Sequence, residues 1–462
     1  MSSERWSTSA RLEPQKDVTK GTHVGRVRYT IVTMLFVATV INYADRATLS
    51  IAGTSVARDL SLHPMQMGLV FSAFGWAYVL AQLPGGLLLD TLGSKRVYFA
   101  SIVLWSLFTF LQGAVHFLPV TAALYVLFAL RFLVGIAEAP SFPGNARIVA
   151  NWFPASERGT ASAIFNSAQY FATILFAPIM GWITLIFGWP YVFYFMGTLG
   201  CLFSIAWLRL VYNPLDHPRL QASELEYIAN GGAIVDADAR ASFTGLRPGG
   251  GAKLREGLAT LLTSRMMWGI YLGQFSINTL TYFFITWFPV YLVQHRGMSI
   301  LNAGLVASIP AMCGFAGGIL GGLWSDTLLR RKFSLSFARK LPIVAGMLLS
   351  TAMIGCNYVE TPWLVVTLMA VSFFGKGVGA LGWAIVADTV PKEMAGFSGG
   401  LFNMFGNLSS ISTPIVIGYI LDTTGSFDGA LLFVAANAVV ATLSYLFLTG
   451  RIQRLEIRSG ST

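Results

Sequence analysis

The stretch GGLLLDTLGSKR at residues 85–96 has a near copy, GGLWSDTLLRRK, at residues 321–332. Six of the twelve aligned positions are identical, and both copies end in a pair of basic residues. A second pair, Phe165–Asn166, recurs as Phe402–Asn403 at nearly the same spacing, 237 residues against 236. Two repeats with almost the same offset indicate that the chain consists of two related halves.

The sequence around these repeats is too apolar for a soluble domain. Hydrophobic residues make up 55% of the 462 residues and charged residues only 11%, whereas soluble proteins carry about a quarter charged residues. Apolar runs long enough to cross a bilayer recur along nearly the whole chain, and runs such as residues 97–115 lack the alternation of a barrel strand. We therefore predict an all-α polytopic membrane protein.

Twelve spans can be placed, six in each half. They lie at about residues 29–52, 67–89, 97–117, 120–146, 159–187, 190–211, 266–293, 302–324, 340–358, 363–388, 395–420 and 428–449. The polar, Gly-rich stretch between the halves is typical of a linker, with a short helix over ASELEYIANGG (222–232). We expect a tail at 1–28, a bundle at 29–212, a linker at 213–265, a second bundle at 266–450 and a tail at 451–462.

Basic residues are concentrated on one side of this topology. If the N-terminus is cytoplasmic, the outward loops hold only Arg58 and Arg296, and the inward loops and C-terminal tail hold Lys95, Arg96, Arg158, Arg330, Arg331, Lys332, Arg339, Lys340, Lys392, Arg451, Arg454 and Arg458. The asymmetry predicts that both termini are cytoplasmic. It also accounts for the net charge of +10 without a nucleic-acid partner.

Other sequence features exclude several classes of site. The first 28 residues are polar and basic, without the apolar core of a removable signal peptide. Cysteines lie singly in apolar runs, and all five histidines fall in loops or at span ends. We therefore expect no metal site, no cofactor and no catalytic cluster, which argues against a membrane enzyme.

Several motifs resemble a known family. The pattern from Gly86 to Arg96 resembles the loop signature of the major facilitator superfamily, and the copy around Asp326 resembles its second, degenerate occurrence. NYADRATLSIAGT (42–54), FSAFGWAYVLAQLPGG (71–86), EAPSFPGNARIVANWFP (138–154), ERGTASAIFNSAQY (157–170) and FFGKGVGALGW (373–383) resemble the anion:cation symporter branch. Within it the chain looks most like bacterial glucarate/galactarate transporters, with galactonate and hexuronate carriers as near relatives. The resemblance implies a twelve-helix carrier with a central cavity that imports sugar acids with protons across the bacterial inner membrane.

Five ionisable residues lie deep inside the spans: Asp45, Arg46, Arg131, Glu138 and Lys376. Each costs about 2.5–3.5 kcal/mol at a helix centre on insertion scales, so such residues usually face a cavity or a partner. The structural alternative is an ion pair between or along helices. It applies best to Arg131 and Glu138, because seven residues are two helical turns and place both on one face. Asp45 and Arg46 diverge by about 100° and cannot pair in that way.

Arg46 and Lys376 are the expected anchors of an anionic substrate. The planar guanidinium of Arg46 matches the two oxygens of a carboxylate and stays charged. Lys376 lies near the middle of its span in the other half, with no acidic residue beside it at that depth. A hexarate carries a carboxylate at each end, so one anchor in each half would hold it across a central cavity.

Asp45 and Glu138 are the expected proton carriers, with Arg131 as their charged neighbour. Burial favours the neutral acid and a nearby arginine favours the carboxylate, so both forms are accessible. In the predicted cycle, protonation on the outer side frees Arg46 for substrate. Release of substrate inside then lets both acids deprotonate and pair with the arginines again.

The resemblance also implies residues for the sugar hydroxyls and for gating. The matched hydroxyl-binding positions are Tyr43, Tyr78, Gln169, Gln274, Trp383 and Asn403, and weaker candidates are Asn166, Asn278 and Asn407. Ala380 and Gly382 replace the small hydroxyl residues of galactonate carriers, which favours a dicarboxylate. The gating motif comprises Gly86, Asp90, Gly93, Lys95, Arg96 and Asp326.

Three alternatives remain open at this point. GKGVGALG (375–382) mimics a nucleotide-binding loop, but it lies inside a span and is better explained by close helix packing. A channel would need a selectivity ring, which the two-half repeat does not suggest. Within the carriers, a galactonate or hexuronate symporter is the runner-up. We expect the chain to act as a monomer in the bilayer.

Overall fold

A computed structural model of the chain describes residues 25–154, 156–235, 258–390 and 395–455. Within these residues all regular structure is helical. The first half contains α1 (Val27–Asp59), α2 (Pro64–Leu92), α3 (Ser94–Gly113), α4 (Val120–Glu138), α5 (Ser141–Trp152), α6 (Arg158–Phe187) and α7 (Trp189–Leu210). The second half contains α11 (Arg265–Thr286), α12 (Phe288–Gln294), α13 (Ile300–Arg330), α14 (Leu335–Ser350), α15 (Pro362–Val378), α16 (Gly382–Thr389), α17 (Ala395–Asn407), α18 (Ser409–Thr424) and α19 (Asp428–Leu443).

The helices confirm the predicted all-α membrane fold. Eleven segments of the described chain are long and apolar enough to cross a bilayer, and the bent pair of α11 and α12 makes a twelfth. Several spans consist of two helices because a residue interrupts the backbone hydrogen bonds. Pro140 separates α4 from α5, and Pro289 follows the 47° bend between α11 and α12.

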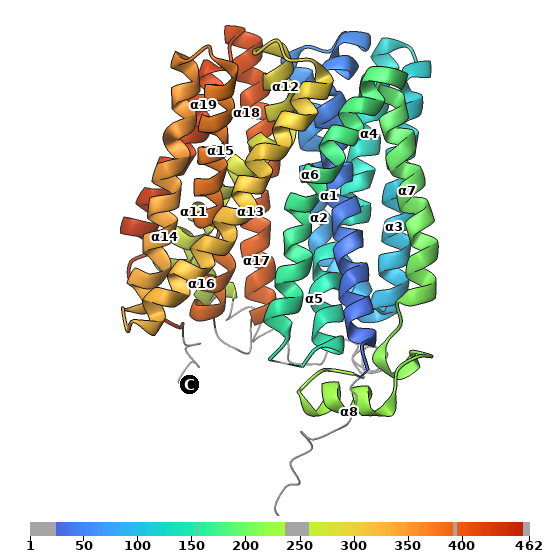
Figure 1. The fold of residues 1–462 in the computed structure, drawn as a ribbon, viewed down its shortest axis with the longest axis vertical. Coiled ribbons are helices and arrows are strands. Elements are labelled where there is room, and N and C mark those ends of the chain that lie inside the picture. The colour runs from blue at the N-terminus through green and yellow to red at the C-terminus, as the bar shows by residue number, and fades with distance from the viewer. Residues whose placement is uncertain (1–24, 155, 236–257, 391–394, 456–462) are drawn as a thin grey trace, which may run out of the picture.

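The two halves lie side by side (Figure 1). α1 to α7 form one bundle, α11 to α19 form the other, and α8 (Ala222–Asn230) lies beneath the first bundle within the expected linker. We call the end of the molecule that carries α8 the α8 end and the opposite one the far end. Both described ends of the chain lie at the α8 end, as an even number of spans requires.

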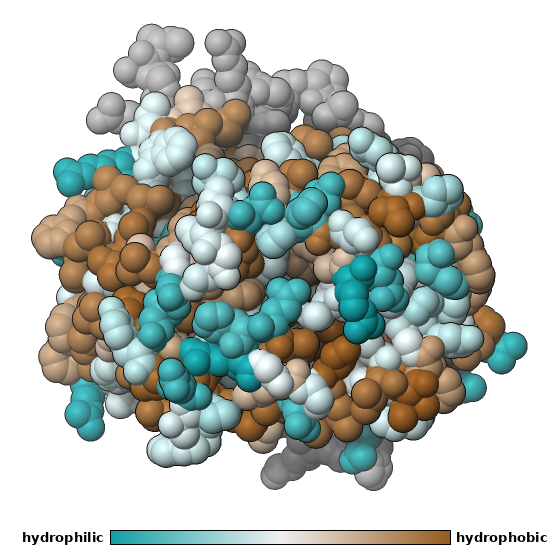
Figure 2. Space-filling view, turned by 90° about the horizontal axis from the view of Figure 1, so that it is seen from above, coloured by the Kyte–Doolittle hydropathy of each residue, from teal (hydrophilic) through white to brown (hydrophobic). Residues whose placement is uncertain are grey.

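The halves touch each other at the far end. α6 packs on α13 and α2 packs on α18. Side chains are nearly absent at these crossings: a Cβ on Gly68 would lie 2.5 Å from the carbonyl oxygen of Pro414, and one on Gly304 would lie 2.5 Å from that of Ala177. The Ser50 hydroxyl donates to the Thr286 carbonyl across the same interface at 2.6 Å. Figure 2 looks onto this end, where polar side chains gather over the ends of the helices.

Glycines in the segment 375–382 confirm the helix-packing interpretation. A Cβ on Gly375 would lie 2.4 Å from the carbonyl oxygen of Gly346 in α14, and one on Gly377 would lie 2.2 Å from that of Gly314 in α13. α15 therefore approaches two neighbouring helices at backbone contact. This packing holds Lys376, which lies between the two glycines, at a defined rotation about the helix axis.

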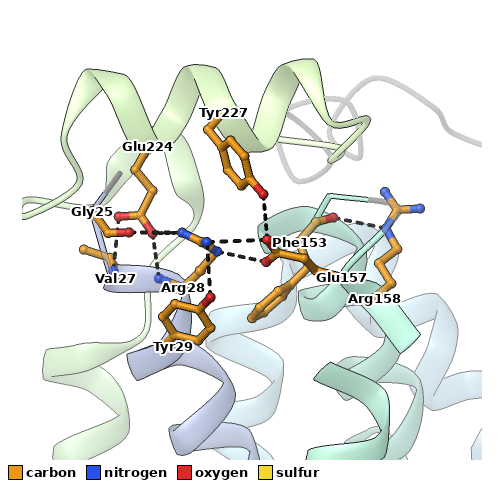
Figure 3. Close-up of polar contacts among 9 residues, drawn as sticks. All are labelled: Gly25, Val27, Arg28, Tyr29, Phe153, Glu157, Arg158, Glu224 and Tyr227. Carbon is orange, nitrogen blue, oxygen red and sulfur yellow. Dashed lines mark hydrogen bonds and ion pairs between the residues drawn. The ribbon is translucent and has the colours of Figure 1, made fainter. Parts of the chain in front are cut away.

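A polar cluster attaches α8 to the first half (Figure 3). The Glu224 side chain is fully buried and accepts hydrogen bonds from the backbone amides of Val27 and Arg28 at 3.1 and 3.2 Å. The Arg28 guanidinium bridges Glu224 at 3.2 Å and Glu157 at 3.0 Å, and the Tyr227 hydroxyl donates to Glu157 at 2.7 Å. We call Arg28, Glu157, Glu224 and Tyr227 the α8 clasp. It makes the first part of the linker a fixed part of the first bundle.

Parts of the expected domain plan lie outside the described residues. They include most of the N-terminal tail (1–24), the middle of the linker (236–257) and the end of the C-terminal tail (456–462). Helix α1 begins at Val27, two residues before the first predicted span.

Candidate functional site

A cavity of about 620 Å³ lies between the two bundles. It is lined by α1, α2, α5 and α6 of the first half and by α11, α13, α15, α16 and α17 of the second. On α13 the lining residues run from Phe315 to Asp326, which lies near the α8 end of that helix. Because the halves meet at the far end, the cavity faces the α8 end.

The eight residues predicted to bind substrate all lie on the wall of this cavity. They are Tyr43, Arg46, Tyr78, Gln169, Gln274, Lys376, Trp383 and Asn403. The three weaker candidates, Asn166, Asn278 and Asn407, line it as well. Residues from both halves, up to 364 positions apart in the chain, are therefore brought to one site (Tyr43 and Asn407).

Arg46 presents its guanidinium among aromatic rings. Its central carbon lies 4.8 Å from the ring centroid of Tyr43, 4.6 Å from that of Phe74 and 4.9 Å from that of Tyr78. The Nε atom donates to Glu138 at 2.9 Å, whereas Nη2 makes no hydrogen bond within the described part of the chain. The rings hold the guanidinium in place, and part of its donor set remains for a ligand.

The three residues predicted for proton coupling lie behind Arg46, buried and away from the cavity wall. Glu138 is 0% exposed and its ion pair is with Arg46. The spacing along α4 favoured Arg131 as the partner, but no ion pair between Arg131 and Glu138 occurs among the described contacts. The Arg46 side chain of α1 reaches Glu138 of α4 instead.

Asp45 is isolated by comparison. Its side chain is 1% exposed, and neither carboxylate oxygen makes a hydrogen bond within the described residues. A buried carboxylate without donors is stabilised by taking up a proton, because burial penalises the charged form.

Lys376 occupies the opposite wall without an acidic partner. The side chain is 5% exposed, and the described ion pairs of the chain do not include it. The ammonium lies 5.2 Å from the ring centroid of Phe373 and 5.7 Å from that of Tyr170. Aromatic faces lower the cost of burying this cation but do not neutralise it.

Amides and hydroxyls line the same cavity as the two cations. Gln274 donates to Asn278 at 2.9 Å. The Tyr282 hydroxyl donates to Asn407 at 2.6 Å, and the Asn407 amide donates in turn to Asn403 at 3.0 Å. Such a network offers both donors and acceptors to a polyhydroxylated ligand. A cation from each half and several amides in one cavity are suited to an anion with two acidic groups and hydroxyls along its length.

Tyr170 and Tyr282 line the cavity but were not among the predicted residues. A spacing signal could have found them. Residues 274, 278 and 282 follow one another at intervals of four, as do 166 and 170, so each set lies on one helix face.

The predicted gating residues lie at the α8 end. Gly93 connects α2 to α3 with φ of +82°, a conformation that favours glycine, and Lys95 lies 3.1 Å from the Tyr212 ring centroid. In the second half, Arg339 bridges Asp388 at 2.8 Å and Asp326 at 3.4 Å.

The other members of the gating motif make no described contact of this kind. Gly86 has open space around it, and Arg96 is exposed. The side chain of Asp90 lies outside the described part of the structure. Asp326 also reaches the cavity wall, so a predicted gating residue borders the site itself.

Comparison with known proteins identifies the family of the chain. Residues 35–338 match the sequence model of the Major Facilitator Superfamily. The chain is 61% identical to the probable galactarate/D-glucarate transporter GudP of Escherichia coli K12, covering 93% of this chain and 95% of that protein. It is 60% identical to the GudP of Bacillus subtilis 168, covering 96% and 97%.

More distant relatives share the architecture. The D-galactonate transporter of E. coli O6:H1 is 38% identical over 93% of this chain and 97% of that protein. Among solved structures, a bacterial homolog of the human lysosomal transporter Spinster superposes with a TM-score of 0.72 at 16% identity, covering 93% of this chain and 98% of that one.

Proposed function

The chain belongs to the major facilitator superfamily, and the relatives that it resembles are transporters and not enzymes. We propose that it imports hexarate sugar acids together with protons. The substrates would be galactarate and D-glucarate, because relatives at 55–61% identity are named as probable transporters of these two acids. The observation that carries the proposal is a pair of cations, Arg46 and Lys376, on opposite walls of one cavity.

Arg46 would bind the first carboxylate. Its Nη2 is unused by the described protein atoms, and its fork geometry fits two carboxylate oxygens. Glu138 occupies the Nε side at 2.9 Å. A proton added to Glu138 removes the negative charge that competes with the substrate for Arg46, which would couple protonation to binding.

Lys376 would bind the second carboxylate. Because burying an unpaired cation is costly, a dianion that supplies a counter-charge gains more here than a neutral sugar would. The amides of Gln274, Asn278 and Asn403 would read the hydroxyls between the two acids. Substrate binding then neutralises both cations at once.

Alternating access would carry the substrate across. The chain is a multi-pass membrane protein whose halves meet at the far end. The basic loops lie toward the α8 end, so we assign that end to the cytoplasm of a bacterial inner membrane. In this orientation the structure corresponds to an inward-facing carrier, and breaking the contacts at the far end would open the cavity outward.

Uptake into proteoliposomes tests the proposal. With an imposed pH gradient, labelled galactarate should accumulate above equilibrium, and unlabelled D-glucarate should compete more strongly than galactonate or glucuronate. A protonophore should abolish accumulation. Stronger competition by galactonate or glucuronate would assign the chain to one of those anions, and uptake that is insensitive to the pH gradient would refute proton coupling.

Lys376→Gln tests the second anchor. Loss of a charge-assisted hydrogen bond should raise the KM for galactarate by about tenfold or more. Lys332→Gln, an exposed lysine at the α8 end, is the matched control and should transport normally. Normal galactarate transport by Lys376→Gln would refute the two-anchor arrangement while leaving sugar-acid transport itself standing.

A further inference from the structure

The surroundings of Lys376 contain a feature that the two-anchor arrangement does not use. Its described neighbours are the rings of Phe373, one turn earlier in α15, and Tyr170, from α6 of the other half. An aromatic face attracts the charge but takes up none of the three N–H donors in a conventional hydrogen bond. The ammonium is thus positioned by rings, with donors available for a ligand.

Tyr170 reaches across the interface to this point. Its ring contacts Phe315 of α13 and Phe373 of α15, with centroid separations of 5.9 and 6.3 Å. The hydroxyl extends to the wall of the second half, 3.9 Å from the position that a Cβ on Gly318 would occupy. The hydroxyl and the ammonium therefore border the same part of the cavity.

Gly318 leaves space beside this hydroxyl. Neighbouring glycines of α13 are required by helix packing, because a Cβ on Gly317 would lie 2.2 Å from the Phe374 carbonyl oxygen and one on Gly321 would lie 2.3 Å from that of Val378. A Cβ on Gly318 would meet nothing closer than 3.9 Å. Packing does not explain a glycine at 318, and this position lines the cavity.

We propose that Tyr170 and Gly318 complete a carboxylate subsite around Lys376 that makes the site selective for dicarboxylates. One carboxylate oxygen would accept from the Lys376 ammonium and the other from the Tyr170 hydroxyl, and Gly318 would supply the volume. Phe315 and Phe373 border the subsite with apolar surface, which strengthens both hydrogen bonds by excluding water.

The inference rests on the proposed function, because it assumes that the second acid of a hexarate lies at Lys376. It adds a physical basis for discrimination between dicarboxylates and aldonates. A sugar acid whose far end is a hydroxymethyl group would leave Lys376 without a counter-ion and Tyr170 without a charged acceptor. The same site would therefore bind an aldonate without the two charge-assisted bonds.

Two substitutions in the full chain, reconstituted in proteoliposomes, test the subsite. Tyr170→Phe keeps the ring on Lys376 and removes only the donor, so the KM for galactarate should rise about tenfold while inhibition by galactonate stays within about twofold. Gly318→Val fills the subsite and should weaken galactarate in the same selective way. Tyr125→Phe and Gly159→Val, both exposed and away from the cavity, are matched controls.

The outcomes separate the two proposals. If the unaltered chain transports galactarate and Lys376→Gln impairs it, yet Tyr170→Phe behaves like Tyr125→Phe, the subsite is refuted and the two-anchor arrangement stands. Equal weakening of galactarate and galactonate by Tyr170→Phe would also refute it, because that result marks a general packing role. If Gly318→Val does not fold, Gly318→Ala, whose methyl meets only ordinary contacts, replaces it and should give a smaller selective loss.

Discussion

Arg46 uses only part of its hydrogen-bond donors on the chain's own carboxylate. Nε is bound to Glu138 at 2.9 Å, while Nη2 has no partner among the described residues. The guanidinium is also enclosed by the rings of Tyr43, Phe74 and Tyr78, so it cannot swing away to a different acid. A change in the charge of Glu138 would therefore alter the electrostatic potential at Arg46, the proposed substrate anchor, without a large movement.

Glu138→Gln should separate binding from proton coupling. The amide retains the size of the acid and a hydrogen-bond acceptor but carries no charge, so it imitates protonated Glu138 at every pH. We expect proton-driven accumulation of galactarate to be lost, exchange of internal for external galactarate to persist, and galactarate affinity to lose its dependence on pH. Accumulation at the level of the unaltered chain would contradict the role of Glu138.

Asp45→Asn addresses the second buried acid. Neither oxygen of Asp45 has a described hydrogen-bond partner, so the substitution should not disturb Arg46 or the cavity. Proton-driven uptake should fall to the level of facilitated exchange, while the binding affinity for galactarate changes by less than about twofold. Counterflow measured with and without a pH gradient distinguishes these quantities, and full active uptake by the variant would refute the role of Asp45.

At the scale of single elements, helix α8 shows how part of a polar linker becomes fixed. Glu224 is fully buried, and its carboxylate receives two backbone amides at the start of α1 as well as the Arg28 guanidinium. These donors replace water around the acid and complement the unsatisfied amides at a helix N-terminus. The α8 clasp consequently moves with the first bundle.

Glu224→Ala should release α8. Removing one member of a buried ion pair costs about 3–5 kcal/mol, because the remaining charge loses its partner. Hydrogen exchange at the amides of residues 222–230, followed by mass spectrometry, should accelerate by about a hundredfold or more. Glu226→Ala removes an exposed acid from the same helix and serves as the control. Unchanged exchange in Glu224→Ala would show that α8 is held by apolar packing alone.

The clasp should also respond to acid through Glu157. Burial by itself would raise the pKa of this carboxyl, but hydrogen bonds from Tyr227 and Arg28 outweigh burial and hold the pKa below its usual range. The contribution of Glu157 to the stability of the clasp is therefore complete above the ordinary glutamate pKa of about 4.3. This contribution is lost as the pH falls through the lower pKa that Glu157 has in the folded chain.

Spin labels on Glu226 and Thr160, both exposed, can follow the clasp across this range. We expect a constant distance between the labels from pH 7 to pH 5 and a broader distribution at lower pH. Glu157→Gln should remove the part of this change that Glu157 causes. Broadening already between pH 7 and pH 5 would contradict the assignment.

For the whole molecule, the contact between the halves at the far end decides which way the cavity faces. The crossings there are backbone to backbone, with Gly68 against Pro414 and Gly304 against Ala177. Because such contacts are short and leave no space, they are either fully made or absent, which suits a carrier that alternates between two states.

Gly68→Ala should therefore shift the balance away from the state described here. The added methyl would lie 2.5 Å from the Pro414 carbonyl oxygen, a clash that only separation of α2 and α18 relieves. Distances between spin labels on Arg58 and Thr423, both exposed at the far end, should show a larger population of long separations. Gly159→Ala, at a glycine with open space around it, is the control. Identical distributions in the two variants would show that this crossing does not set the balance.

The sequence by itself determined the class of fold, the twelve spans, the two related halves and the identity of the five intramembrane charges. These are properties of composition and of repeats along the chain, because a bilayer demands long apolar helices and penalises each buried charge. Family resemblance also indicated six of the eight predicted binding residues that line the cavity, and the cost of an intramembrane charge indicated the other two, Arg46 and Lys376.

Only the tertiary structure decided which of these residues meet. Helical spacing favoured Arg131 as the partner of Glu138, but the side chain of Arg46, from α1, takes that place. Tyr170 and Lys376 come from different halves, and the space at Gly318 depends on the crossing of α13 and α15. Such pairings depend on the rotation of each helix about its axis and on where two helices cross, and neither quantity is written in the hydropathy of a single span.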